Sequence, residues 1–147
     1  MSLAENKKAY FDYEILEKLE AGLQFTGQET KSVRLGQISL KGAFVSFHNG
    51  NAYLTGAHIT PYQPAGPLPD YDPEQSRRLL IHKKELRYLQ AKSQEQGLTI
   101  VPLSVYTKNR FLKVEIGVGR GKKQYDKRET LKKRDVLREV QKALKER

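Results

Sequence analysis

The sequence contains no cysteine. The chain therefore has neither a disulfide framework nor a thiolate metal site. It also lacks any run of apolar residues long enough to span a bilayer, and its first eight residues lack the apolar stretch of a signal peptide. These absences favour a cytoplasmic protein without a membrane partner.

Motifs for catalysis or cofactor binding are lacking too. His48, His58 and His82 do not have the spacing of metal ligands. Residues 117–123 superficially resemble a phosphate-binding loop, but the spacing is one residue short and no Ser or Thr follows the lysine, so a hinge is the better interpretation. No serine or aspartate is spaced as a nucleophile with its base. We expect no enzymatic activity, no metal and no cofactor.

Positive charge is abundant and concentrated at one end of the chain. The 147 residues have a formal net charge of +10, and 37% of them are hydrophobic, enough for one modest core. Residues 120–147 hold 12 Lys/Arg against 5 Asp/Glu, a net of +7, whereas residues 1–119 hold 15 against 12, a net of +3. A mildly basic body with a strongly basic tail favours polyanion partners, although a well-solvated surface would explain charge alone.

Alternating apolar and polar residues predict the first half of the fold. From Tyr13 to Phe25 the odd positions are mostly apolar, as in a strand with one face buried. Thr26 and Glu29 form a capping-box pattern, which predicts a short helix that ends before Gly36. Residues 43–56 consist of two β-rich runs around an Asn-Gly turn, the pattern of a β-hairpin.

The second half predicts further strands and one more helix. Five prolines mark residues 61–73 as an exposed loop. A helix is expected over 83–96, closed by Gly97, and two β-rich runs, 98–106 and 111–118, are joined by a four-residue turn. The predicted fold class is mainly β: a closed antiparallel β-barrel of the oligonucleotide-binding type with short helices.

The two ends of the chain lack these patterns. Residues 1–8 look like a loose polar lead-in, and the glycines and like charges of 119–123 argue against a stable element there. Beyond them, a helix would be too short and too charged to be stable alone. We expect residues 1–119 to form the barrel and residues 120–147 to form a tail that is disordered when free and helical against a partner.

Two segments contain aromatic side chains in patterns found in RNA-binding proteins. Tyr125 is surrounded by cations, and such a segment can stack on a base while neutralising phosphates. A solvated charged terminus explains its composition equally well. Residues 41–47 resemble the aromatic strand of RNA-recognition domains but lack one ring, so core packing is the better account of this segment.

Eight short segments, in order along the chain, decide between these interpretations, and the most specific is Gly-Lys-Lys-Gln-Tyr-Asp-Lys-Arg at 121–128. Together they resemble the signatures of the small protein B (SsrA-binding protein) family over essentially the whole chain. Thr30 and the turn at 107–110 depart from the family pattern. The segments are 6–9, 20–23, 26–34, 56–62, 72–73, 78–83, 113–117 and 121–128.

The resemblance implies an RNA-binding adaptor with an oligonucleotide-binding-fold barrel. In this family the barrel binds the tRNA-like part of transfer-messenger RNA (tmRNA, or SsrA RNA), and both enter stalled ribosomes for trans-translation. The tail lies in the empty mRNA path near the small-subunit rRNA of the decoding centre. Alanyl-tRNA synthetase and elongation factor Tu are implied as indirect partners.

The resemblance also implies which residues contact RNA. Glu20 is instructive, because a carboxylate accepts hydrogen bonds from base amino or 2′-hydroxyl groups, which a cation cannot do; its structural alternative is a cap for the following turn. In the tail, Tyr125 would stack on a decoding-centre base, its cationic neighbours would meet phosphates, and Asp126 would order the helix start. The expected RNA-binding residues of the body are Asn6, Lys7, Glu20, Lys31, Arg34 and Leu80, and those of the tail are Lys122, Lys123, Tyr125, Asp126, Lys127 and Arg128.

Two other classes of function remain open on the residues alone. A general ribosomal or single-strand-binding protein of the same fold would bind many RNAs with similar affinity, without preference for a tRNA-like elbow. An RNA-modifying enzyme would need a catalytic group or a cofactor loop, for which the sequence offers no candidate.

Overall fold

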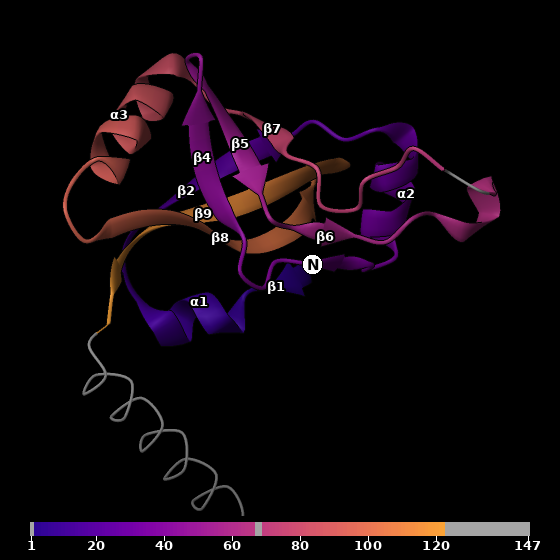
Figure 1. Ribbon diagram of the computed structural model, residues 1–147, viewed down its shortest axis with the longest axis horizontal. Coiled ribbons are helices and arrows are strands. Elements are labelled where there is room, and N and C mark those ends of the chain that lie inside the picture. Colours follow the sequence, from indigo (N-terminus) through magenta and orange to yellow (C-terminus); the bar gives the residue numbers. More distant parts are fainter. Residues whose placement is uncertain (1, 67–68, 123–147) are drawn as a thin grey trace, which may run out of the picture.

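Antiparallel strands are the main regular elements of the structure, a computed structural model that describes residues 2–66 and 69–122 (Figure 1). Seven strands form one sheet in the order β1-β8-β9-β2-β7-β5-β4. Two short strands, β3 (Ile38–Ser39) and β6 (His58–Ile59), form a second sheet. The strands of the large sheet are β1 (Ser2–Glu5), β2 (Tyr13–Leu23), β4 (Phe44–His48), β5 (Asn51–Thr55), β7 (Arg77–Leu80), β8 (Leu98–Lys108) and β9 (Phe111–Gly121).

Three α-helices lie around this sheet: α1 (Lys7–Asp12), α2 (Gly27–Arg34) and α3 (Lys83–Ser93). A 3-10 turn, Gln63–Ala65, lies within the proline-rich loop. In Figure 1, α1 lies below the sheet, α2 lies to the right and α3 to the upper left, while β4 and β5 cross in front of β8 and β9. The predicted class, mainly β with short helices, is confirmed.

The hydrogen-bonded ladder of the large sheet does not close within the described part of the chain. There, β1 pairs with β8 and β4 pairs with β5, and neither edge strand has a second partner in the ladder. A closed barrel therefore stays a prediction.

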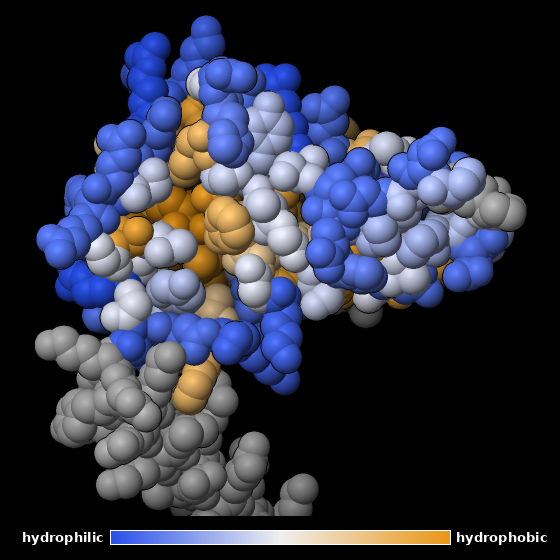
Figure 2. Space-filling view, viewed as in Figure 1, coloured by the Kyte–Doolittle hydropathy of each residue, from blue (hydrophilic) through white to orange (hydrophobic). Residues whose placement is uncertain are grey.

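Figure 2 shows apolar side chains in the space between α3 and β4, and mostly polar ones over the α2 end of the molecule.

The main apolar core lies on the inner face of the curved sheet. Val45 and Leu54 of the first hairpin pack there with Ile100 of β8 and Val114 and Ile116 of β9. Phe47 packs against the same cluster, as expected from the alternation of residues 41–47, whereas Phe44 points outward and is 43% exposed. Core packing, rather than an RNA-stacking platform, is thus confirmed for the inward residues of this segment.

A bulge in β2 reverses the sense of its alternation. The register between β2 and β9 shifts between Ile15 and Glu17, with Leu16 as the extra residue. After the bulge, Leu19 and Ala21 face the main core. Before it, Ile15 packs on the opposite, outer face in a smaller cluster with Ala9 of α1, Val101, Leu103 and Tyr13.

Local sequence signals account for the helix start and for both hairpins. The Thr26 hydroxyl accepts from the Glu29 backbone N–H at 3.1 Å, while the Glu29 carboxylate accepts from the Thr26 N–H at 3.2 Å, so the predicted capping box is present. Asn49 and Gly50 connect β4 to β5 with positive φ angles, as a two-residue hairpin turn requires. The predicted hairpin between β8 and β9 is also confirmed, but its turn has two residues, Asn109 and Arg110, instead of the predicted four, because Thr107 and Lys108 still pair with β9.

Three predictions about element boundaries were wrong. The polar lead-in forms β1, whose backbone pairs with β8, and the start of α1, which Asn6 caps. Gly119 to Gly121 continue β9 instead of breaking it, since β2 pairs with them on one side and β8 with Gly119 and Arg120 on the other. A side chain at Gly119 would come within 2.9 Å of the Tyr13 Cβ, so its lack of a side chain is needed for packing rather than for flexibility. Helix α3 ends at Ser93, three residues before the predicted end.

Among the helices within the described residues, none is long and apolar enough to cross a membrane.

Candidate nucleic-acid interface

The outer face of the sheet brings together several of the residues predicted to bind RNA. Because side chains alternate along a strand, Lys18, Glu20 and Gly22 point away from the core formed by Leu19 and Ala21. The ladder places Glu20 opposite Glu115 of β9, and Gly22 opposite both Lys113 of β9 and Leu80 of β7. These outward positions on β2, β7 and β9 form a continuous surface.

Glu20 is held by two neighbours on that surface. The Tyr106 hydroxyl of β8 donates a hydrogen bond to its carboxylate, and the Lys108 ammonium lies 3.3 Å from the carboxylate Oε1. The hydrogen bond from Tyr106, followed by Lys108, lowers the pKa of Glu20. Burial and the same hydrogen bond raise the pKa of Tyr106. The side chain of Glu20 keeps 36% exposure, so an oriented, ionised acceptor faces solvent. It does not cap a turn.

A groove of about 760 Å³ connects Glu20 with Leu80. Three basic side chains line it, Arg78 from β7, Lys83 from α3 and Lys113 from β9, together with a second carboxylate, Glu85 of α3. The predicted residue Leu80 is 52% exposed in the wall of this groove. A Cβ at position 22 would come within 3.3 Å of the Leu80 Cβ, so glycine at Gly22 allows Leu80 to lie across β2. The groove combines cations, one oriented acceptor and an apolar wall, which suits a folded RNA rather than a bare phosphate chain.

Asn6 and Lys7 lie at the other end of the same face, at the start of α1. Asn6 is 4% exposed and uses its whole side chain within the protein: its Oδ1 accepts from the Ala9 N–H at 3.2 Å, and its Nδ2 donates to the Pro102 carbonyl at 2.9 Å. Asn6 is therefore the N-cap of α1. Its contact with RNA stays a prediction, and the structure gives it the role of positioning α1. Lys7, the next residue, is exposed beside Glu115.

Lys18 makes one cation–π contact and one ion pair, which connect the α1 end of the face with its centre. The Lys18 ammonium lies 5.4 Å from the centre of the Tyr10 ring on α1 and 3.8 Å from the Glu115 carboxylate. The hydrogen bond with Tyr10 is the largest cause of the raised pKa of Lys18. A path of adjacent polar groups thus runs from Lys7 through Glu115 to Glu20.

Lys31 and Arg34 extend from α2, one turn apart. The Arg34 Nη2 donates to the Arg110 carbonyl in the β8–β9 turn at 2.8 Å, which places Arg34 beside Leu80 in a second hollow. The Lys31 ammonium lies 5.5 Å from the centre of the Tyr62 ring and is exposed. Arg34 therefore joins the surface of Glu20 and Leu80, whereas Lys31 contacts the loop that follows β6.

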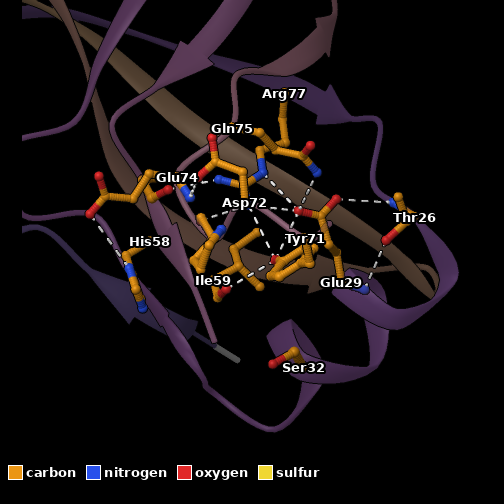
Figure 3. A network of polar contacts seen from close by, with 12 residues as sticks. Thr26, Glu29, Ser32, His58, Ile59, Tyr71, Asp72, Glu74, Gln75 and Arg77 are labelled. Atoms are coloured by element: carbon orange, nitrogen blue, oxygen red, sulfur yellow. Dashed lines mark hydrogen bonds and ion pairs between the residues drawn. The ribbon is translucent and has the colours of Figure 1, made fainter. Parts of the chain in front are cut away.

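Helix α2 is anchored by a buried ion pair that the sequence did not predict (Figure 3). Arg77 donates to the Glu29 carboxylate from Nε at 2.9 Å and from Nη2 at 2.6 Å, and both side chains are 2% exposed. Tyr71 and Gln75 donate to the same carboxylate at 3.2 and 3.1 Å. Burial raises the pKa of Glu29, but the hydrogen bonds from Arg77, the Thr26 backbone and Gln75 outweigh it, so the pKa lies below its usual value. This network holds the helix that presents Lys31 and Arg34.

Lys122, the first of the tail residues predicted to contact the ribosome, is attached to the body. The Lys122 backbone N–H donates to the Asp12 carbonyl at 2.8 Å, and its ammonium donates to the Tyr10 carbonyl at 3.1 Å. Lys122 therefore lies against the C-terminal half of α1. The other predicted tail residues, Lys123, Tyr125, Asp126, Lys127 and Arg128, lie outside the described residues.

Sequence reasoning missed Tyr106, Lys108 and Lys113 as neighbours of Glu20. The sequence does place the three on one face of a predicted hairpin, but their proximity to Glu20 depends on β2 pairing with β9.

No cluster of three His, Cys, Asp or Glu side chains that could hold a metal occurs within residues 2–66 and 69–122.

Comparisons with known proteins bear on the whole chain. The family model described as "SmpB protein" matches residues 3–146. An SsrA-binding protein of Leuconostoc mesenteroides is 54% identical over 143 residues, 97% of this chain and 92% of that protein. An SsrA-binding protein of Carboxydothermus hydrogenoformans is 48% identical over 145 residues, 99% of this chain and 97% of that protein.

A solved structure is similar in fold as well as in sequence. A chain from the structure described as "tmRNA-SmpB: a journey to the center of the bacterial ribosome" superposes with a TM-score of 0.68 at 45% identity. The alignment covers 82% of this chain and 84% of that one.

Proposed function

The chain belongs to the SmpB protein family, and on that premise we propose that it is an RNA-binding adaptor of ribosome rescue. It binds the tRNA-like domain of tmRNA and brings this RNA to stalled ribosomes for trans-translation. The observation behind the proposal is that the family match extends through both the sheet and the basic C-terminal segment, over residues 3–146.

The outer sheet face supports the RNA-binding part of the proposal. Lys7, Glu20, Leu80 and Arg34 come from four different elements and lie along one surface. Cations on this surface neutralise phosphates, while Glu20, oriented by Tyr106, accepts hydrogen bonds from base amino or 2′-hydroxyl groups. In this proposal the curved sheet acts as an oligonucleotide-binding-type barrel with its ligand on the outside.

The basic segment performs the second part of the function. We assign Tyr125 to stacking on a base of the decoding centre and Lys122, Lys123, Lys127 and Arg128 to phosphates in the empty mRNA path. Asp126 orders the start of a helix there. Alanyl-tRNA synthetase charges the bound RNA and elongation factor Tu accompanies it, so the chain itself performs no chemistry. Its location in the cell is then that of ribosomes, the cytoplasm.

A truncation tests the division of labour. Because Lys122 is attached to Asp12 and Tyr10, the cut belongs after Lys122. A chain ending there should retain most of its affinity for the isolated tRNA-like domain and should lose tagging of stalled nascent chains. Simultaneous loss of RNA binding and tagging would contradict the two-part assignment.

Variants of the segment separate stacking from charge. Tyr125→Ala should impair tagging at low and high salt, because stacking depends little on ionic strength, while Tyr125→Phe should retain most of it. Lys127→Ala combined with Arg128→Ala should be partly rescued at low salt. All three should bind the tRNA-like domain normally. If Tyr125→Ala tags like the unaltered protein at both salt concentrations, its ring has no role.

Preference for tmRNA distinguishes this function from general RNA binding. The full chain should bind the tRNA-like domain much more tightly than an unrelated structured RNA of equal length, measured by titration at matched salt. Equal affinities would favour the general RNA-binding class.

A further inference from the structure

An exposed aromatic ring at the β8–β9 turn belongs to no core cluster. Phe111 is 68% exposed, the largest exposure among the large apolar side chains in the described part of the chain. It lines a hollow of about 340 Å³ with Leu80, which is 52% exposed, and Phe25. Hollows of this size are within the range of small-ligand sites, roughly 300–1,000 Å³. Two large apolar side chains left in solvent at one place indicate a contact surface.

Two guanidinium groups flank this apolar surface. Arg34 from α2 and Arg110 from the turn both line the hollow. The bond from Arg34 Nη2 to the Arg110 carbonyl holds Arg34 in place and leaves its other N–H groups for a ligand. A ring beside cations matches the two parts of a nucleotide, because the base stacks and the phosphate is neutralised.

The backbone of the turn gives independent support. Arg110 has a φ of +70°, a left-handed conformation that usually requires glycine at this position of a two-residue hairpin turn. The β4–β5 turn has glycine at the equivalent position, Gly50, with a φ of +75°. An arginine held in a strained conformation at the rim of the hollow is the kind of outlier that accompanies a binding role.

We propose that this hollow binds one unpaired nucleotide of a structured RNA, with the base against Phe111 and Leu80 and its phosphate against Arg34 and Arg110. The proposal rests on the proposed function, because that RNA is the tRNA-like domain. The site adjoins the Glu20 groove through Leu80, which lines both. A base turned out of a loop of the RNA would therefore be recognised while the rest of the domain lies along the outer face.

The first experiment measures the affinity of the full chain for a transcript of the tRNA-like domain. Phe111→Ala should weaken binding by about 5- to 100-fold, the range of one stacked base. Phe111→Tyr should bind nearly normally, whereas Phe111→Leu, which keeps apolar volume without a ring, should lose most of the affinity. Phe44→Ala is the matched control, since Phe44 is also exposed but lies outside the hollow. Thermal melting of each variant verifies the fold.

Salt dependence separates the ring from the cations. The loss caused by Phe111→Ala should be the same at low and high salt, while Arg110→Ala should reduce the slope of log K against log salt by about one. Arg110→Gly should have the same effect on RNA binding and should relieve the strain of the turn, so a weakened but more stable protein is expected.

Fluorescence identifies the nucleotide. With 2-aminopurine placed in turn at the unpaired positions of the transcript, one position should change its emission with the unaltered protein and not with Phe111→Ala. If Phe111→Ala binds the transcript like the unaltered protein, the inference is wrong even though the proposed function stands. If the variant loses only ribosome engagement, the hollow is a docking site for another partner and the inference is again wrong. If the unaltered protein shows no preference for the tRNA-like domain, the proposed function itself fails.

Discussion

Two glutamates of this protein have similar partners and opposite surroundings. Glu29 accepts from Tyr71 and Arg77 and is 2% exposed. Glu20 accepts from Tyr106 and lies beside Lys108 with 36% exposure. The pKa of both carboxyl groups is lowered: that of Glu20 by the hydrogen bond from Tyr106 and by Lys108, and that of Glu29 by the hydrogen bonds from Arg77, the Thr26 backbone and Gln75, which outweigh the effect of burial.

Because the two clusters differ in burial, they have different roles. Within the Glu29 cluster both carboxylate oxygens accept from protein donors. Removing Arg77 would therefore leave an unpaired charge buried in the protein. Glu20 has lone pairs open to solvent and can add donors from a ligand. A carboxylate with a phenol and a cation therefore stabilises the fold at Glu29 and forms part of a binding surface at Glu20.

The largest expected effect comes from breaking the buried pair. Arg77→Ala should destabilise the protein by about 3–5 kcal/mol, because Glu29 would be left ionised and buried. Denaturant unfolding measures this loss. The double variant Arg77→Met with Glu29→Leu should be less destabilised than Arg77→Ala alone. Lys92→Ala, which removes a solvent-screened ion pair with Glu95, should hardly change stability. Equal losses of stability in Arg77→Ala and Lys92→Ala would contradict the stabilising role of the buried pair.

The second effect concerns binding by Glu20. Glu20→Ala should weaken affinity for the tRNA-like domain by about 5- to 100-fold, as expected when an acceptor of bonds from RNA is removed. Thermal stability should hardly change, since the side chain is exposed. Glu95→Ala serves as the control and should slightly strengthen binding by raising the net charge. Small, equal effects at Glu20 and Glu95 would show that the acceptor is not used.

The third effect is the response to acid. The pKa of Glu29 is lowered from its usual value of 4.5, so its ionised form adds stability that is fully present above about pH 4.5 and is lost as pH falls through the lowered pKa. Stability should therefore fall on acidification below about pH 4.5. In Glu29→Gln this fall should be shallower, whereas Glu20→Gln should follow the unaltered protein closely because solvent screens its contacts. Parallel urea titrations between neutral pH and pH 3 give the comparison, and identical acid profiles for Glu29→Gln and the unaltered protein would count against it.

The smallest effects come from removing single hydroxyls. Tyr71→Phe should cost about 0.5–1.5 kcal/mol of stability and leave RNA affinity unchanged. Tyr106→Phe should leave stability nearly unchanged and weaken RNA binding by about 2- to 10-fold, because Glu20 would lose its orientation. Melting and RNA titration of both variants are needed, and a loss of the same kind in both would mean that Tyr106 has no special part in binding.

Local sequence determined the elements whose stabilising groups are close along the chain. The capping box of Thr26 and Glu29 started α2, the Asn49-Gly50 turn set the first hairpin, and alternation identified the buried face of the later strands. Each of these features depends on groups that are no more than a few residues apart, so the sequence alone is enough to predict it. The family and its RNA-binding role were also predicted from short segments distributed along the chain.

Only the tertiary structure decided the partners of groups far apart in the sequence. Glu29 caps its own helix, but nothing local revealed that Arg77, 48 residues later, would neutralise it. Tyr106 is 86 residues from Glu20 and reaches it because β2, β9 and β8 pair in one sheet. Gly119 looked like a flexible link, yet pairing on both sides made it part of β9. Local preferences are weak beside the hydrogen bonds and burial that a neighbouring strand supplies, and which strands become neighbours is a property of the whole chain.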